Sequence, residues 1–380
     1  GADELNLLCS MTAHGINPNI HTIARICNPD YTDQVYKMQK TFALSLTVNP
    51  EKQAAIEIER LLKFPGFLKR DSFAKGRVEI VELRVDERSR LCNVALSEMN
   101  RVIKCRVLVC AVLRRGDVVA PDGSFVLREG DRIFVTASTE SLATLLDNLG
   151  IITKKVNHVM ICGGGRVSYY LAQQLEKDGI TVRLIEKDSK HCEELAALLP
   201  KTEIINDDAS NTFVLKRENL ESCDALVTAT GMDELNMIIS LYGTKHGVSQ
   251  VITKLGHMEN GSMIDQLPIG STIWPKDLCC NGIVRYIRAM HNQTGAAVSV
   301  HSIADGKAEA IEFHVEEKKP YCDKPLKNMK VKQNILVACI THGGVTELPG
   351  GDSVIREGDT VVVVTTRNDI IYKLDDIFEA

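Results

Sequence analysis

The fold of this chain is decided by one stretch, residues 156–186, which reads VNHVMICGGGRVSYYLAQQLEKDGITVRLIE. It begins with a short apolar run and passes through three consecutive glycines, Gly163 to Gly165. An amphipathic segment and a second apolar run follow, and the second run ends at Glu186. Strand, glycine turn, helix and strand in this order are typical of the βαβ unit of a dinucleotide-binding fold.

The glycine turn has the features expected of a phosphate site. Gly163 permits a tight turn, and Gly165 lets the backbone approach a pyrophosphate at the N-terminus of the following helix. Ser168 stands where the fingerprint has its third glycine, and its small side chain still allows close packing of helix on strand. A carboxylate at Glu186 suits ribose hydroxyls and repels a 2′-phosphate, which favours NAD(H) or an adenine nucleotide over NADP. The alternative is a glycine turn in an α/β domain that holds no ligand.

Further candidate binding residues lie in the turn or where later predicted strands end. The Arg166 guanidinium could clamp a pyrophosphate, or it is a solvated loop arginine. Asp208 could accept a hydrogen bond from an adenine amino group, or it could cap the next helix. Thr230 and Gly231 follow the fourth strand, where Gly231 would allow phosphates to approach, and Lys254 near the end of the fifth strand could reach a phosphate. These strand ends meet at the carboxyl edge of a parallel sheet, where such folds bind ligands.

The composition excludes several other classes of protein. The chain of 380 residues is long enough for two or more cores, and its net charge of −5 offers no basic surface for nucleic acid. No uncharged apolar run approaches the length of a membrane span. The 12 cysteines form no C-x-x-C pair and lie mostly in apolar strands, which indicates free thiols in a reducing cytosol.

No catalytic apparatus or metal site is expected. The sequence has no H-E-x-x-H or G-x-S-x-G motif and no Cys/His cluster at metal-ligand spacing. His191 and His246 fall on predicted helices and are interpreted as surface or packing residues, as is His291. We therefore expect a binding protein rather than an enzyme.

The chain contains an internal duplication. Residues 107–150 align without a gap on 335–378, and both segments share the run Arg-Glu-Gly-Asp, at 128–131 and 356–359. Upstream, the string Asp-Glu-Leu-Asn at 3–6 recurs at 233–236, and Arg25 aligns with Lys254. Gly1 aligns with Gly231, so we expect the first copy to lack its glycine turn and the natural protein to be longer. The shared Arg-Glu-Gly-Asp run predicts a β-turn with Gly at positive φ and Asp bonded to the turn backbone, in preference to a ligand role.

The repeat predicts an α/β fold with two tandem units, each a Rossmann-like half with a parallel doubly wound sheet followed by a small α+β half. The expected domains are a truncated first Rossmann-like half at 1–62, a first α+β half at 63–150, a complete Rossmann-like half at 154–276 and a second α+β half at 290–380. Strands are expected at 20–26, 44–48, 76–86, 106–114, 132–137, 157–162, 181–185, 203–206, 225–229 and 250–255. Helices are expected at 3–15, 33–41, 50–64, within 91–99, and at 140–149, 167–177, 190–198, 212–217, 233–246 and 277–292.

The glycine turn with Glu186, the Thr230–Asn236 string, the Ile252–Leu255 strand and the Arg-Glu-Gly-Asp turns together resemble the RCK (KTN) family, regulators of potassium conductance. Two fused units of this kind are similar to the cytosolic regulatory subunits of Trk potassium uptake systems, and the resemblance spans essentially the whole chain. It departs from the family pattern at Ser168 and Asp207, where glycine is common.

The resemblance implies a nucleotide site for NAD(H), ATP or ADP. Its residues in this chain would be Gly163, Gly164, Gly165, Arg166, Val167, Glu186, Thr230, Gly231 and Lys254. It also implies a membrane-embedded Trk potassium channel or transporter subunit as partner, self-association into a dimer or tetramer ring, and a cytoplasmic position at the inner face of the membrane. Nucleotide exchange would change the shape of the ring and gate ion flow.

Three other hypotheses stay open at this point. The chain could be a soluble NAD-dependent oxidoreductase, which would need an acid/base residue beside the nicotinamide. It could be a regulator of the same kind that acts on a different cation or anion transporter. The second copy could also be an inert scaffold, with sensing done by the first site.

Overall fold

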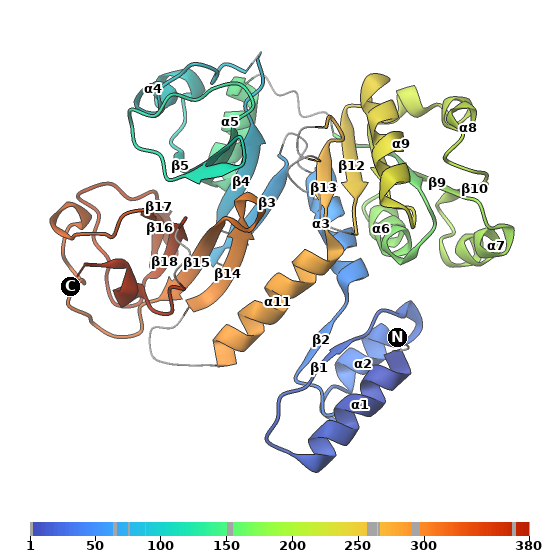
Figure 1. Ribbon diagram of the computed structural model, residues 1–380, viewed down its shortest axis with the longest axis horizontal. Helices are drawn as coiled ribbons and strands as arrows, with labels where there is room; N and C mark the ends of the chain where they lie inside the picture. The colour runs from blue at the N-terminus through green and yellow to red at the C-terminus, as the bar shows by residue number, and fades with distance from the viewer. Residues whose placement is uncertain are drawn as a thin grey trace. The chain divides into compact units, whose positions relative to one another are not determined.

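The computed structural model describes residues 3–63, 67–74, 77–87, 89–149, 155–256, 264, 267–290, 297–366 and 370–379. The chain divides into two compact units (Figure 1). Unit 1 combines residues 1–63 with 155–283, and unit 2 combines residues 64–154 with 284–380. Each unit therefore contains one segment from each copy of the repeat.

Unit 1 is built on a parallel sheet with the strand order β10-β9-β8-β11-β12-β13. The strands are β8 (His158–Cys162), β9 (Thr181–Glu186), β10 (Glu203–Asn206), β11 (Ala225–Thr228), β12 (Gln250–Lys254) and β13 (Ser271–Ile273). The intervening helices are α6 (Arg166–Lys177), α7 (Ser189–Leu198), α8 (Thr212–Arg217) and α9 (Asp233–Lys245), and α11 (Pro275–Met290) follows the last strand. The order reverses between β8 and β11, which is the topological switch point of a doubly wound sheet.

The two faces of this sheet are buried in separate cores, because side chains alternate along each strand. Val159 and Ile161 of β8 pack with α6 and α7 in one core. Met160 and Cys162 of the same strand pack with α8 and α9 in the other. A strand buried on both faces needs a continuous apolar sequence, and VMIC, residues 159–162, supplies one after the exposed His158.

The first copy contributes one helix to this fold and forms a smaller lobe beside it. Its elements are α1 (Asp3–Ile16), β1 (Ile23–Arg25), α2 (Pro29–Lys37), β2 (Leu46–Val48) and α3 (Pro50–Lys63). The α3 side chains Ala54, Ile58 and Leu62 are buried in the same core as α6. The Gln250 side chain of β12 also donates to the Leu61 carbonyl at 2.7 Å.

Equivalent hydrogen bonds confirm the duplication within unit 1. The Asp3 carboxylate accepts from the backbone N–H groups of Cys27 and Asn28, at 2.7 Å each. Its counterpart Asp233 accepts from the N–H of Gly256 at 2.8 and 2.9 Å. Parallel β1 and β2 thus correspond to β12 and β13 of the second copy.

Unit 2 holds two antiparallel sheets with the same strand order. One has the order β3-β4-β7-β5-β6 and the other β14-β15-β18-β16-β17. The first consists of β3 (Lys69–Phe73), β4 (Val78–Arg84), β5 (Leu108–Arg114), β6 (Asp117–Val119) and β7 (Arg132–Ser138). The second consists of β14 (Ala297–Ile303), β15 (Ala308–His314), β16 (Ile335–His342), β17 (Val345–Glu347) and β18 (Thr360–Thr365). The bulge between Val109 and Ala111 recurs at the aligned positions, between Val337 and Cys339.

Each sheet of unit 2 has a core of its own and shares a third with the other sheet. In the first copy, α4 (Leu96–Ile103) and α5 (Thr139–Leu149) cover the outer face. In the second copy the 3-10 turns η4 (Leu326–Asn328) and η5 (Leu374–Ile377) stand at the corresponding places. The inner faces meet around Ala111, Phe134, Ala310, Cys339 and Val362.

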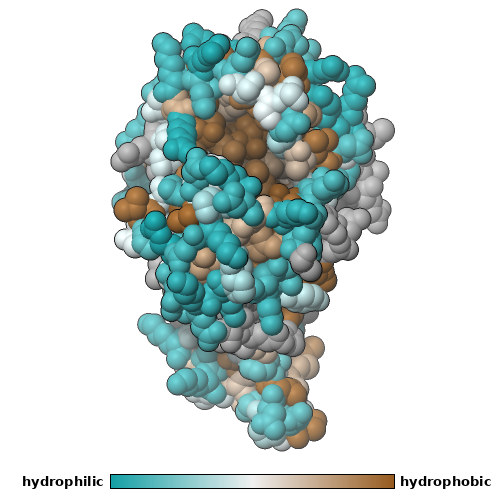
Figure 2. Space-filling model, turned by 90° about the vertical axis from the view of Figure 1, so that its left-hand side faces the viewer, coloured by the Kyte–Doolittle hydropathy of each residue, from teal (hydrophilic) through white to brown (hydrophobic). Residues whose placement is uncertain are grey.

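The face of the molecule drawn in Figure 2 is largely hydrophilic, with an apolar hollow in the upper part of the view.

The structure confirms most predicted elements and corrects several. The helix expected at 33–41 is α2, which begins at Pro29 because the Asn28 side chain caps it. The helix expected within 91–99 is α4, which begins at Leu96. The strands β3, β6 and β13 were not predicted, nor were β14 and β17, which are the second-copy equivalents of β3 and β6. The β-turn interpretation of Arg-Glu-Gly-Asp is confirmed, since φ is +85° at Gly130 and +86° at Gly358, and Asp131 and Asp359 each accept from the turn backbone.

No described helix is long and apolar enough to cross a membrane. Among the described residues there is also no group of histidine, cysteine and acidic side chains that could hold a metal ion.

Candidate functional site

The glycine turn lies at the switch point of the unit 1 sheet, between β8 and α6. Gly163 has φ +97°, a conformation that side chains rarely adopt. A Cβ atom there would also lie 2.8 Å from the Cα of Thr230, in the turn after β11. The two loops that flank the switch point are therefore in direct contact, and only glycine fits at their contact.

Gly164 is held on both sides by its neighbours. Its N–H donates to Oε2 of Glu186 at 2.7 Å, and its carbonyl lies 2.9 Å from Nε2 of His191. A Cβ atom would lie 2.7 Å from Cδ1 of Leu195 and 3.0 Å from the Glu186 carboxylate. The end of β9 and the first turns of α7 thus close over this residue.

Gly165 is exposed and faces open space. It has no neighbouring atom within 4 Å of the position of a Cβ, and it is the N-cap residue of α6 with no side chain to cap the helix. The first N–H groups of α6 therefore remain available to an anion. Arg166 is exposed beside them, whereas the Val167 side chain is buried in the core and only its backbone faces the turn.

Glu186 ends β9 and supports the turn. Its Oε2 accepts from Gly164, and its Oε1 accepts from the N–H of Asp188 at 2.9 Å. A carboxylate has about four lone-pair sites, so two remain for ribose hydroxyls. Glu186, the predicted ribose acid, thus lies beside the turn and is fixed in orientation by two backbone hydrogen bonds.

The turn after β11 is organised by Asn236, which the sequence analysis did not single out. Its Oδ1 accepts from the N–H and the hydroxyl of Thr230 at 2.9 and 2.7 Å. Its Nδ2 donates to the carbonyls of Thr230 and Lys254 at 3.3 and 2.9 Å. Asn236 is fully buried, so these bonds fix the ends of β11 and β12 relative to each other. Gly231 next to Thr230 is exposed, and a Cβ atom built on it would meet nothing within 4 Å.

Lys254 reaches this same turn. Its Nζ donates to the Thr230 carbonyl at 2.7 Å, on the loop that touches Gly163. Burial lowers the pKa of Lys254, and the nearby carboxylates of Asp233 and Glu51 act against that shift. A half-buried ammonium group next to the switch point is well placed to meet an anionic ligand.

Asp208 lies after β10, one strand further from the switch point. Its Oδ1 accepts from the N–H of Ser210 at 2.8 Å, and this bond is the main cause that lowers the pKa of Asp208. The proposed helix cap is wrong, because Asn211 caps α8 by accepting from the N–H of Phe213. Asp208 instead closes a local turn with Ser210, and the residue is exposed.

His191 on α7 is the second residue that sequence reasoning missed. It was interpreted as a surface or packing residue, yet its ring contacts the Gly164 carbonyl within the turn. The hydrogen bond to Glu194 is the largest cause that raises the pKa of His191, burial opposes it, and the bond to Gly164 adds to it. A histidine five residues after the strand-end acid was the only indication in the sequence.

These observations define an RCK-type protein with one complete Rossmann-like nucleotide fold and a pair of small α+β halves. The family model described as the TrkA-N domain matches residues 159–275. The model described as the TrkA-C domain matches twice, at residues 80–150 and 310–378. Together the matches cover more than half of the chain, and the chain belongs to the TrkA family.

Relatives extend the match to nearly the full length. A Trk system potassium uptake protein TrkA homolog of Methanosarcina mazei is 28% identical, over 96% of this chain and 81% of its own. A TrkA homolog of Archaeoglobus fulgidus is 28% identical over 100% and 84%, and TrkA of Haemophilus influenzae is 26% identical over 100% and 82%.

Solved structures share the fold. The GsuK RCK domain superimposes with a TM-score of 0.57 at 14% identity, covering 96% of this chain and 76% of its own. The GsuK channel bound to NAD gives a TM-score of 0.55 at 14% identity, covering 96% and 63%. At this identity the likeness concerns the fold, and the binding chemistry must come from the residues of this chain.

Proposed function

We propose that this chain is a nucleotide-sensing regulatory subunit of a potassium uptake system. The observation that carries the proposal is the turn at Gly163–Arg166, which presents the free N-terminus of α6 at the switch point of a parallel sheet. The ligand is NAD(H) or an adenine nucleotide. Its role is that of a signal, so the protein is not an enzyme.

Each predicted residue has a role in this proposal. The pyrophosphate lies over Gly165 and the first N–H groups of α6, with the Arg166 guanidinium beside it. Glu186 accepts from the ribose hydroxyls. Lys254 and the Thr230–Gly231 turn contact the ligand from the β11 and β12 side of the site. Asp208 accepts a hydrogen bond from the adenine amino group. Gly163 and Gly164 shape the turn, and Val167 contributes its backbone.

The regulatory role follows from the family. The relatives are named as Trk system potassium uptake proteins, and one solved structure of the same fold is a channel bound to NAD. We propose that this chain self-associates and acts on a membrane-embedded Trk subunit from the cytoplasmic side. A nucleotide changes ion flow only if it binds two conformations of the assembly with different affinity.

Calorimetry with NADH, NAD⁺, ATP and ADP tests the binding site. Asp is a favourable N-cap, so Gly165→Asp should fold normally while its carboxylate occupies the phosphate position and abolishes binding. Gly350→Asp is the matched control, because Gly350 also faces open space at an ordinary φ but lies in unit 2. Equal binding by wild type and Gly165→Asp would place the ligand elsewhere, and binding of none of the four would refute the sensor function.

Potassium flux tests the regulatory role. The Trk membrane subunit of the same organism is reconstituted in vesicles with this protein, and flux is measured with NADH, with ATP and without nucleotide. We expect the flux to depend on the nucleotide and to lose that dependence with Gly165→Asp. A flux that is identical in all conditions would contradict the proposal.

A further inference from the structure

His191 has an acceptor at each of its ring nitrogens. Its Nε2 lies 2.9 Å from the Gly164 carbonyl oxygen, and its Nδ1 lies 3.0 Å from Oε2 of Glu194. A neutral imidazole carries one N–H and can donate to only one of them. The imidazolium ion carries two and satisfies both, so this geometry is that of protonated histidine.

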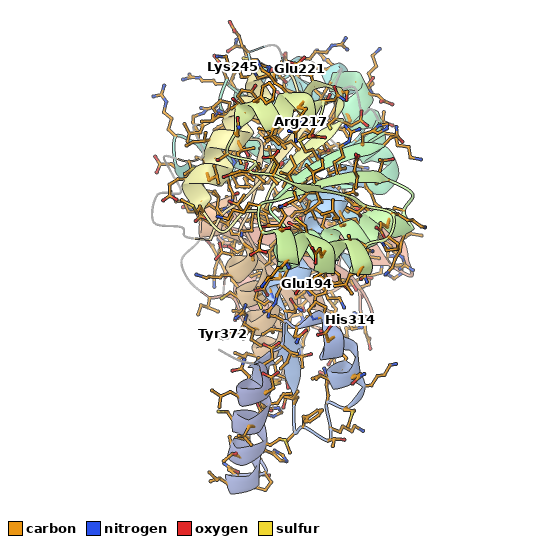
Figure 3. The ribbon with its side chains drawn as sticks, turned by 90° about the vertical axis from the view of Figure 1, so that its right-hand side faces the viewer. Glu194, Arg217, Glu221, Lys245, His314 and Tyr372 are labelled. Atoms are coloured by element: carbon orange, nitrogen blue, oxygen red, sulfur yellow. The ribbon has the colours of Figure 1, made fainter. Side chains whose placement is uncertain are left out.

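The charges around the ring favour the same state. Glu194 on its own helix, labelled in Figure 3, and Glu186 at the end of β9 are the charged groups that act on it, and both are acidic. The glycine turn faces the ring with the Gly164 carbonyl, and Asp188 accepts from the His191 backbone N–H at 3.0 Å. The pKa of His191 is raised accordingly, so the proton is held to higher pH than on an ordinary histidine.

The ring acts on the middle peptide of the glycine turn. The N–H of Gly164 is fixed by Glu186 from one side, and its carbonyl is fixed by His191 from the other. The orientation of this residue sets where the N–H groups of Gly165 and α6 point. His191 and Glu186 thus form a clamp on the turn.

Loss of the proton weakens the clamp. A neutral ring can donate to only one of its two acceptors, the Glu194 carboxylate or the Gly164 carbonyl. Hydrogen bonds to charged groups are the stronger ones. Glu194 therefore competes for the remaining N–H, which leaves the Gly164 carbonyl without its partner. At the same time the positive charge beside the glycine turn, where the anionic ligand would bind, is lost.

We propose that His191 is a positioning residue for the nucleotide, so that the affinity of the site falls as the pH rises through the titration of this histidine. The proposal rests on the proposed function of the site. It adds a second input, proton concentration, to the response of the protein.

Nucleotide affinity as a function of pH is the test. NADH and ATP are titrated calorimetrically at about pH 6 and about pH 8.5, which bracket histidine titration. Loss of one hydrogen bond and one nearby charge predicts roughly three- to tenfold weaker binding by the wild type at the higher pH. His191→Gln should bind at the weaker level at both pH values, and His191→Arg, a permanent cation, should bind at the stronger level at both.

His246→Gln is the matched control. His246 also lies at a helix and bonds a glutamate, Glu221, at 3.0 Å, but it packs on Tyr242 away from the turn. The His246→Gln variant should keep the wild-type dependence of nucleotide affinity on pH. If His191→Gln keeps that dependence as well, the proposal is overturned.

NMR titration of the imidazoles in the ligand-free protein separates this proposal from the proposed function. Glu194→Gln removes the main cause of the raised pKa, and should lower the pKa of His191 whether or not nucleotide binds. If the wild type binds neither NADH nor ATP at any pH, the nucleotide site itself is refuted. If nucleotide binds but Glu194→Gln leaves the pKa of His191 unchanged, only the proposed role of His191 is refuted and the nucleotide site stands.

Discussion

At the scale of single residues, Asn236 and Asn6 show how the same residue serves differently in the two copies. Asn236 is fully buried and makes four hydrogen bonds to the turn after β11 and the end of β12. Asn6, at the aligned position, donates to the Arg25 carbonyl at 2.8 Å in exposed surroundings. The bond to the basic residue of the strand is common to both, and the buried network belongs to the second copy.

Asn236→Ala should therefore cost about 2–4 kcal/mol of unfolding free energy, because it leaves buried backbone groups without partners. Asn6→Ala should cost less than about 1 kcal/mol, since water replaces the lost bond. Urea unfolding of both variants measures the difference. Equal costs would contradict the assigned role of Asn236.

Ser168 shows the opposite situation, a buried polar group without a partner. Its hydroxyl is shielded from solvent in α6 and has no hydrogen-bond partner. Ser168→Ala removes this unsatisfied group, and alanine is also the better helix former. We expect the variant to be more stable by up to about 1 kcal/mol in urea unfolding. A clear loss of stability would show that the hydroxyl is satisfied in solution.

The positions of several residues of the candidate site could be predicted from the sequence. The glycines, Glu186 and Lys254 stand at fixed places relative to predicted strands, so their meeting at one sheet edge follows from the parallel topology. His191 and Asn236 could not be predicted, because a polar residue on a helix has no periodic pattern that shows which loop its tip will reach. The role of Asp208 was also open in sequence, since capping and turn closure use the same residue types.

At the scale of elements, the two Arg-Glu-Gly-Asp turns show how a shared backbone acquires different support. Asp131 accepts from the Arg128 N–H and from two nitrogens of Arg114 at 2.7 Å each. Asp359 accepts from the Arg356 N–H and is paired with His342. Both aspartates are completely buried. The bidentate arginine pair should stabilise its turn more strongly.

Asp131→Ala should therefore destabilise unit 2 by about 3–5 kcal/mol, because it leaves a guanidinium without its partner and a buried N–H unpaired. Asp359→Ala should cost less, about 2–3 kcal/mol, since its partner His342 is half exposed and can be hydrated. Thermal unfolding of both variants checks the order. The reverse order would contradict this account of the turns.

Long elements were predicted better than short ones. The central strands of unit 1 are continuous apolar runs between helices, and their predicted bounds lie within a residue or so of the structure. The strands β6 and β13 have three residues each and lie at sheet edges, where one neighbour supplies the pairing and little apolar sequence is needed. The helix α2 was misplaced because a cap at Asn28 and Pro29 outweighs the apolar periodicity that follows.

At the scale of the whole molecule, the repeat gives unit 2 the form of a dimer within one chain. Asp71 and His301 occupy aligned positions of the two copies and meet at 2.9 Å, with both side chains largely buried. The His301 ring also packs on Phe73, with centroids 4.5 Å apart. Two identical subunits could not place an acid opposite a histidine here, so the duplication allows a complementary pair.

A double-mutant cycle on Asp71→Ala and His301→Ala should give a coupling energy of about 1–2 kcal/mol. Either single exchange, Asp71→His or His301→Asp, places two like groups opposite each other and should lower the stability. The double variant that carries both exchanges should recover most of the lost stability. Urea unfolding supplies all the values. Additive effects and no recovery would show that the pair contributes nothing specific.

The nucleotide should stabilise unit 1 alone. The chain has one tryptophan, Trp274, and it lies in unit 1 after β13. Tryptophan fluorescence therefore reports the unfolding of the nucleotide-binding unit. We expect NAD⁺ at 100 times its Kd to stabilise that transition by about 2.7 kcal/mol, and Gly165→Asp to abolish the effect. A transition that does not move with NAD⁺ would contradict binding in unit 1.

The central claim is that a nucleotide binds over the glycine turn, and a crystal structure with millimolar NADH tests it most directly. We predict electron density for the pyrophosphate over Gly165 and the N-terminus of α6, with a ribose on Glu186. Density at another place on the molecule, or none above Gly163–Gly165 at saturating NADH, would contradict the claim.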